Sequence, residues 1–137
     1  MKLKHLFFTL IFLGFINCNK SNSSNNSIVG NTYYLVQNGS LVLCTMDIKT
    51  SNKFEELIIL TFSKCLLSRE VEFIGSYDKT TNSIKYQSLS RNKEIVFSED
   101  GNFGFDKRTK KLSLISKVYY ENLTPNERTT VLNKKLE

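Results

Sequence analysis

Turn signals recur about every 10 residues from residue 28 onward, and they constrain the fold more than any other feature of the sequence. The clearest is Asn38-Gly39, because both residues accept the positive φ that a two-residue hairpin turn requires. It separates two segments rich in apolar and β-branched residues, Thr32–Gln37 and residues 40–48. The sequence therefore predicts an antiparallel hairpin near the start of a β domain.

The turn also predicts the register of this hairpin. Gln37 faces Ser40, which brings Tyr33 opposite Cys44 on one side of the ribbon. Met46 continues the same side of the second strand, and we expect this side to face the core.

The opposite side of the ribbon is apolar as well. It carries Tyr34, Val36, Leu41 and Leu43. Such a face needs cover from the C-terminal segment, an apolar ligand or a partner protein. We expect the C-terminal segment to provide it, and the alternative is that these four residues form an apolar binding face.

Later turns extend the pattern. Asp78 and Asp106 each precede an alternating apolar segment, where an Asp carboxylate can accept hydrogen bonds from the backbone ahead. Residues 99–102, which include Asp100-Gly101, mark a third turn. We predict an all-β fold, a single antiparallel meander of about eight strands that forms a barrel or a sandwich.

Two segments are ambiguous. Residues 54–67 fit either a helix or a strand, and their alternating apolar positions favour the strand. Thr124, Pro125 and Glu127 form a good helix start, whereas residues 128–132 favour a strand. We expect at most one helical turn near the C-terminus, followed by a closing strand.

The N-terminus has the layout of a secretory signal peptide, with a short basic start and an apolar run at residues 6–16. This run is too short to cross a membrane, because a spanning helix needs about 20 apolar residues. It ends just before Cys18, and residues 19–27 contain only Asn, Ser and Lys. We expect that polar segment to be a flexible tether with a mean reach of about 16 Å.

This arrangement resembles the signal of bacterial lipoproteins, in which cleavage occurs just before a Cys that then carries acyl chains. The resemblance implies a signal peptide at residues 1–17, a lipidated Cys18 with its tether at residues 18–27, and a β domain at residues 28–137. Acyl chains such as palmitate on Cys18 would anchor the protein to the membrane. Asn19, rather than Asp, follows the Cys, so the resemblance also implies the outer membrane, with the leaflet open.

The β domain has a more diffuse pattern, formed by residues 29–34, 75–77, 84 and 100–103. It resembles the small lipocalin-like β-meanders found among bacterial lipoproteins. The lipocalin signature itself has Gly, any residue and Trp, whereas Gly30 is followed by Asn31 and Thr32, and the chain has no Trp. The resemblance therefore implies a lipocalin-like barrel or sandwich, without implying a true lipocalin ligand cup.

The chemistry open to the mature chain is restricted. The single histidine, His5, lies in the predicted leader, so the commonest general base and metal ligand would be lost. We expect no metal, no cofactor and no enzymatic activity. Cys44 and Cys65 form an even pair in an exported chain, which favours a disulfide over two buried thiols.

Two pairs of acidic residues stand close together, Glu70 with Glu72 and Glu99 with Asp100. Paired carboxylates can catalyse glycoside hydrolysis, but we interpret these as a solvated strand face and as turn caps. Ser90 and Lys93 have the spacing of a Ser-x-x-Lys nucleophile, which we attribute to chance because they stand in a polar turn.

Residues 28–137 carry 16 Lys and Arg against 13 Asp and Glu, a net charge of +3. Such a charge is typical of a soluble domain and does not indicate a nucleic-acid partner. The densest basic cluster comprises Lys107, Arg108, Lys110 and Lys111 in a predicted turn. We interpret it as a solvated loop tip, with a contact to lipid headgroups or a polyanion as the alternative.

Taken together, these features predict a lipid-anchored protein of the cell envelope with a non-catalytic domain that binds a protein partner or a small apolar ligand. An envelope enzyme that uses paired carboxylates is one alternative. A lysozyme-inhibitor-like protein is another, although it would need an acidic loop, and the net charge of +3 argues against one.

Overall fold

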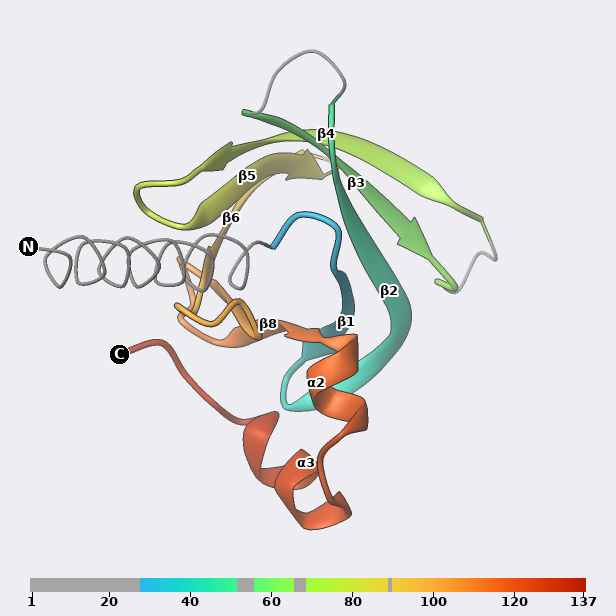
Figure 1. Ribbon diagram of the computed structural model, residues 1–137, viewed down its shortest axis with the longest axis vertical. Coiled ribbons are helices and arrows are strands. Elements are labelled where there is room, and N and C mark those ends of the chain that lie inside the picture. Colours follow the sequence, from blue (N-terminus) through green and yellow to red (C-terminus); the bar gives the residue numbers. More distant parts are fainter. Residues whose placement is uncertain (1–27, 52–55, 66–68, 89) are drawn as a thin grey trace, which may run out of the picture.

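The computed structural model describes residues 28–51, 56–65, 69–88 and 90–137, which form a closed eight-stranded barrel with two short helices at its side (Figure 1). The strands are β1 (Thr32–Gln37), β2 (Ser40–Thr50), β3 (Leu57–Ser63), β4 (Val71–Asp78), β5 (Ser83–Ser88), β6 (Arg91–Phe97), β7 (Phe103–Asp106) and β8 (Leu112–Ser116). The helices are α2 (Lys117–Glu121) and α3 (Pro125–Val131). The predicted signal peptide, Cys18 and the tether lie outside the described residues.

Each strand pairs antiparallel with the next one along the chain. The barrel is closed by β1 and β8, which pair antiparallel through Tyr33 with Ser116 and Leu35 with Leu114. The predicted meander is therefore confirmed, and it forms a barrel rather than a sandwich. Closure leaves no unpaired sheet edge, which is the usual way in which antiparallel sheets avoid pairing with other chains.

The first hairpin turns at Asn38 and Gly39, with φ of 49° and 77°, and Gln37 pairs with Ser40 as predicted. The register prediction beyond the turn is wrong, because Tyr33 pairs with Met46 and not with Cys44. A β-bulge at Tyr34–Val36 adds two residues on the β2 side. An even insertion preserves the two faces, so Cys44 and Met46 still face inward and are buried.

Of the two ambiguous segments, the first contains strand β3, as predicted; residues 54, 55, 66 and 67 lie outside the described part. The second begins as predicted, with a capping box in which Thr124 and Glu127 bond to each other's backbone N–H groups. The expected closing strand is wrong, because α3 continues to Val131 and β8 closes the barrel instead. No helix in the described part of the chain is long and apolar enough to cross a membrane.

Buried apolar side chains form two clusters on opposite faces of the sheet. The inner cluster fills the barrel and comprises Ile28, Tyr33, Met46, Ile48, Ile58, Leu60, Ile84, Ile95, Phe97 and Leu114. The outer cluster comprises Val36, Phe103, Phe105, Leu112 and Ile115, packed against Tyr34, Leu41, Tyr119, Tyr120, Val131, Leu132 and Leu136. The sheet around β1, β7 and β8 is therefore apolar on both sides, because the C-terminal segment covers its outer face.

The Asp turns also form as predicted. The Asp78 carboxylate accepts a hydrogen bond of 2.9 Å from the backbone N–H of Thr80. The Asp106 carboxylate accepts one of 2.8 Å from the N–H of Arg108 and a second of 3.3 Å from that of Thr109. These bonds fix the β4–β5 and β7–β8 turns from within the loops themselves.

Candidate functional site at the open end of the barrel

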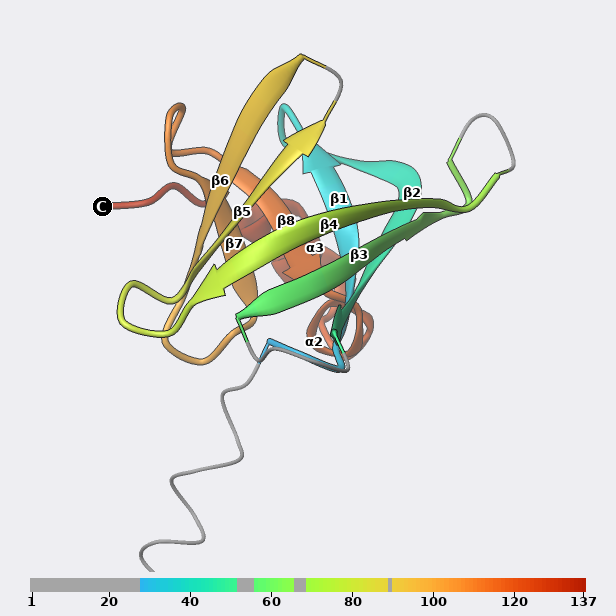
Figure 2. The ribbon, with the colours of Figure 1, turned by 90° about the horizontal axis from the view of Figure 1, so that it is seen from above.

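The two ends of the barrel differ. One end is closed by the chain that enters β1, where Ile28 is fully buried and the Gly30 N–H donates a 2.7 Å hydrogen bond to the Ile48 carbonyl. The Tyr33 hydroxyl adds a 2.7 Å bond to the Gly101 carbonyl in the β6–β7 turn. In Figure 2 this end lies at the bottom, and the β1–β2 hairpin lies at the opposite end.

The opposite end opens into a cavity of about 400 Å³, which we call the cup. Inward-facing apolar side chains from six strands line it: Leu35, Val42, Phe62, Tyr86, Ile95 and Leu114. The fully buried residues Met46, Ile48 and Leu60 lie deeper along the same strands and make the lower barrel solid. The cup is therefore an end pocket above a packed core, and not a channel.

Three aromatic rings gather at the cup and are only partly buried. The rings of Phe62 and Phe73 meet edge to face, with centroids 5.4 Å apart. The Tyr86 ring lies 6.1 Å from Phe62 and 6.2 Å from Phe73. Their partial exposure leaves ring surface that an apolar molecule could cover.

A second cavity of about 610 Å³, which we call the groove, adjoins the cup beside β5, β6 and the β7–β8 turn. The two cavities share Tyr86, Lys93, Asp106 and Arg108, so they meet at these four side chains. The groove is otherwise polar. Its further lining includes Lys85, Arg91, Glu94 and Lys107.

The acidic groups here are already paired with lysines. Glu94 lies 3.3 Å from the Lys107 ammonium, and Asp106 lies 4.0 Å from that of Lys93. Arg108 lines both cavities, and within the described residues no acidic side chain lies in ion-pair distance of its guanidinium. The junction of cup and groove therefore has an excess of positive charge.

Tyr86 brings a hydroxyl to this junction. Burial raises the pKa of Tyr86 to about 12, and the nearby Asp106 carboxylate contributes to the rise. The phenol therefore stays protonated at neutral pH and can donate a hydrogen bond to an acceptor in the cavity.

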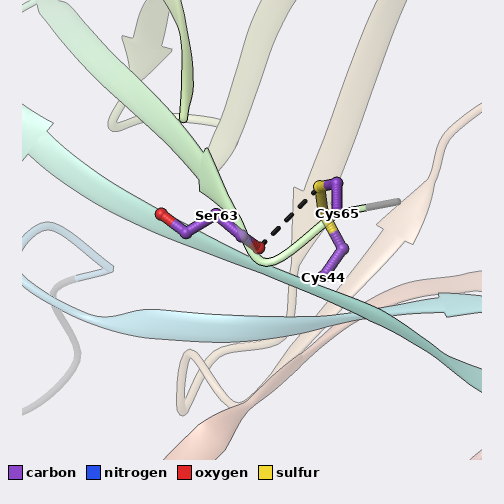
Figure 3. The surroundings of a disulfide bond; sticks show 3 residues. All are labelled: Cys44, Ser63 and Cys65. Carbon is purple, nitrogen blue, oxygen red and sulfur yellow. Dashed lines mark hydrogen bonds between the residues drawn. A yellow bond between two sulfur atoms is a disulfide. The ribbon is translucent and has the colours of Figure 1, made fainter. Parts of the chain in front are cut away.

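Cys44 and Cys65 are joined by a disulfide, with their Cα atoms 4.5 Å apart (Figure 3). It links β2 to the residues just after β3, at the open end of the barrel. Cys65 also lies 3.8 Å from the Ser63 carbonyl oxygen. The bond restrains one side of the cup entrance.

The four residues of the expected apolar binding face do not stay together on the surface. Tyr34, Val36 and Leu41 belong to the outer cluster beneath the C-terminal segment, whereas Leu43 is 81% exposed. The Tyr34 ring contacts the Tyr120 ring at 5.8 Å. The cover is thus largely intramolecular, as expected.

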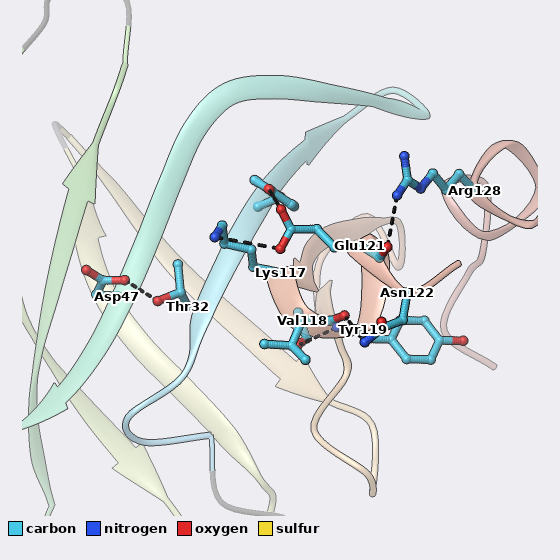
Figure 4. Close-up of polar contacts among 10 residues, drawn as sticks. Thr32, Asp47, Lys117, Val118, Tyr119, Glu121, Asn122 and Arg128 are labelled. Carbon is cyan, nitrogen blue, oxygen red and sulfur yellow. Dashed lines mark hydrogen bonds and ion pairs between the residues drawn. The ribbon is translucent and has the colours of Figure 1, made fainter. Parts of the chain in front are cut away.

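Helix α2 is held over this face by polar contacts, several of which appear in Figure 4. Glu121 accepts a 2.9 Å hydrogen bond from the Tyr34 hydroxyl and lies 3.7 Å from the Lys117 ammonium. Arg128 of α3 donates hydrogen bonds to the carbonyls of Tyr120 and Glu121, each at 3.1 Å. These bonds dock the two helices against each other and against β1.

The other candidate residues are scattered. Glu70, Glu72 and Glu99 are exposed, and Asp100 accepts hydrogen bonds from Ser98 and the Asn102 backbone within its own turn. Among the described residues, no group of three or more His, Cys, Asp or Glu side chains could hold a metal ion.

Sequence patterns alone did not indicate the cup or the groove. The parity of β6 places Lys93 on the same face as Ile95 and Phe97, so an inward-pointing cation could have been noticed. Alternation along a strand does not tell which end of a barrel is open. The Lys107–Lys111 cluster, interpreted as a solvated tip, supplies Arg108 and Lys111 to the cup lining.

In comparisons with known proteins, the chain matches no family model, no curated protein and no solved structure.

Proposed function

We propose that this protein is a lipid-anchored binding protein of the cell envelope, attached through acyl chains on Cys18, which takes a small apolar molecule into the cup. The proposed activity is binding without catalysis. The anchor rests on the sequence of the first 27 residues, and the ligand site rests on the structure of the barrel.

The observation that supports the binding site best is the cluster of three partly buried rings, Phe62, Phe73 and Tyr86, because Phe62 and Tyr86 line a cavity of about 400 Å³. Ligand pockets commonly measure about 300–1,000 Å³ and combine apolar walls with a few polar groups. The cup has both kinds of group, since its apolar side chains share the lining with polar ones that include Lys93 and Arg108.

The position of the chain entry favours this assignment. Ile28 lies at the closed end of the barrel, so a tether that ends at residue 27 would attach opposite the cup. The cup could then face away from the lipid surface and exchange its ligand with the surrounding solution.

Substitutions at two neighbouring residues of β2 test the site. Val42 lines the cup, and Leu43 points outward with 81% of its surface exposed. A Val42→Trp substitution should fill the cup and abolish binding of decan-1-ol, measured by isothermal titration calorimetry. Leu43→Trp adds the same ring on the outer face and should leave binding unchanged.

Failure of the wild-type protein to bind both decan-1-ol and decanoate, or equal binding by the two variants, would overturn the ligand site. The anchor has its own test, the intact mass of the membrane-extracted protein. Cleavage before Cys18 with added acyl mass is expected, and an unmodified mass would overturn the lipoprotein assignment.

A further inference from the structure

The charges around the cup indicate which kind of apolar molecule it would accept. Six cationic side chains line the cup or the groove, namely Lys85, Arg91, Lys93, Lys107, Arg108 and Lys111. The acidic side chains that line the same two cavities are Glu94 and Asp106, and each is already paired with a lysine. An anion at the junction would therefore meet uncompensated positive charge.

Arg108 is the best placed of these cations. It lines both cavities, and its backbone is fixed because the Asp106 carboxylate accepts a 2.8 Å hydrogen bond from its N–H. A guanidinium presents several N–H donors in a plane, which suits bidentate bonds to carboxylate or phosphate oxygens. The turn thus holds a free cationic donor at the cup entrance.

The apolar and cationic surfaces meet at one place. Tyr86 contacts the Phe62 and Phe73 rings on one side and lines the groove on the other. Its protonated hydroxyl adds a neutral donor beside Lys93, its partner in the β5–β6 ladder. A molecule with its chain over the rings would therefore bring its head group to Arg108.

We infer that the cup selects amphiphiles that carry one anionic head group, a carboxylate or a phosphate, with the head bound at Arg108 and the chain lying over Phe62 and Tyr86. This inference rests on the proposed ligand site and names the class of ligand. It also assigns a role to the basic turn, since Arg108 would give a neutral head group only an uncharged acceptor's hydrogen bond and would repel a cationic one.

The test compares ligands of equal chain length on the whole mature domain by isothermal titration calorimetry. Decanoate and decyl phosphate should bind at least about tenfold more tightly than decan-1-ol, and decylammonium should bind more weakly than the alcohol. Inorganic phosphate should not bind measurably, because it lacks the chain. Equal affinity for the alcohol and the acids, or binding of inorganic phosphate as tight as that of decyl phosphate, would overturn the inference.

Variants of Arg108 test where the anionic head group of the ligand binds. Arg108→Gln should weaken decanoate binding about tenfold and decan-1-ol binding by much less, and the retained binding of the alcohol shows that the variant is folded. Arg108→Lys should retain part of the preference. Lys49→Gln removes an exposed cation of β2 outside both cavities and is the matched control, with no effect on either ligand.

The outcomes separate the two proposals. If decan-1-ol and decanoate bind equally and only Val42→Trp abolishes both, the ligand site stands and the head-group selection is wrong. If no decyl compound binds to the wild-type protein, the ligand site is wrong and the selection fails with it.

Discussion

The Tyr33 hydroxyl donates a 2.7 Å hydrogen bond to the carbonyl oxygen of Gly101, a residue 68 positions later in the chain. The tyrosine side chain is fully buried, and its ring also lies 5.3 Å from that of Phe97. One side chain of the first strand therefore ties the β6–β7 turn to the closed end of the barrel. This contact can form only when β1 has come close to the β6–β7 turn.

Removal of this hydroxyl should weaken the closed end. Tyr33→Phe keeps the ring but leaves the Gly101 carbonyl without its donor, and we expect a loss of about 1–3 kcal/mol in the free energy of unfolding. Urea unfolding followed by circular dichroism measures the change. Tyr34→Phe is the control. It removes a hydroxyl that bonds to the exposed Glu121, and it should lower the free energy of unfolding by less than about 1 kcal/mol.

Because of Tyr33, we expect the free energy of unfolding to fall at alkaline pH. Burial raises the pKa of Tyr33 to about 12, whereas the unfolded chain ionises near the usual value of 10.0. The folded state therefore holds this proton more tightly, so the stabilisation is complete below pH 10 and is lost as the pH rises towards 12. Tyrosinate absorbance should show that Tyr33 and Tyr86 ionise only near pH 12. Titration of all six tyrosines near pH 10 in the folded protein would contradict the assignment.

The disulfide should contribute substantially to stability. Cys44 and Cys65 are 21 residues apart, and closure of a loop of this size stabilises a fold by about 3 kcal/mol in the chain-entropy treatment. Reduction should lower the urea midpoint of the wild-type protein. The double variant Cys44→Ser, Cys65→Ser should have the low midpoint with or without reductant, and a wild-type midpoint insensitive to reduction would contradict the prediction.

The capping box of α3 should determine how well the C-terminal cover is held. Thr124→Ala removes the hydroxyl that accepts a hydrogen bond from the Glu127 N–H, and the expected loss is about 1 kcal/mol. Amide hydrogen exchange should accelerate in α3 while β3 and β4 stay protected. Thr129→Ala, on the exposed side of the same helix, should leave exchange unchanged or slightly slower.

Short-range sequence signals predicted the turns whose geometry depends on groups within a few residues of each other. Asn38-Gly39 and the carboxylates of Asp78 and Asp106 determine their turns with groups only a few residues apart. The β-bulge opposite Tyr34 could not be inferred, because it depends on how β1 reaches both β2 and β8 when the barrel closes.

The C-terminal segment shows why strand propensity misled. Thr129 and Thr130 direct their hydroxyls to the carbonyls four residues earlier, at 3.2 Å each, which a helix accommodates. Val131 then packs into the outer cluster. Tertiary packing against β1 and β8 thus outweighs the preference of β-branched residues for strands.

The candidate site was hidden for a related reason. Phe62 is far in sequence from the paired residues Tyr86 and Lys93, and strand parity gives only the face on which each residue lies. The three side chains meet at a cavity because packed side chains fill the barrel at Met46 and Leu60 but not at the opposite end. Ile28 contributes to that difference, because it is fully buried at the closed end.

The apolar packing on both faces of β1, β7 and β8 has a practical consequence for experiments on this protein. In that sector every strand has side chains enclosed on each side, so fluorophores, cross-linkers or surface charges introduced there would disturb folding. The outer faces of β2 and β4 are different, since Leu43 and Ile74 are 81% and 73% exposed. Dyes or immobilisation handles at these two positions would report on the native barrel without displacing its core.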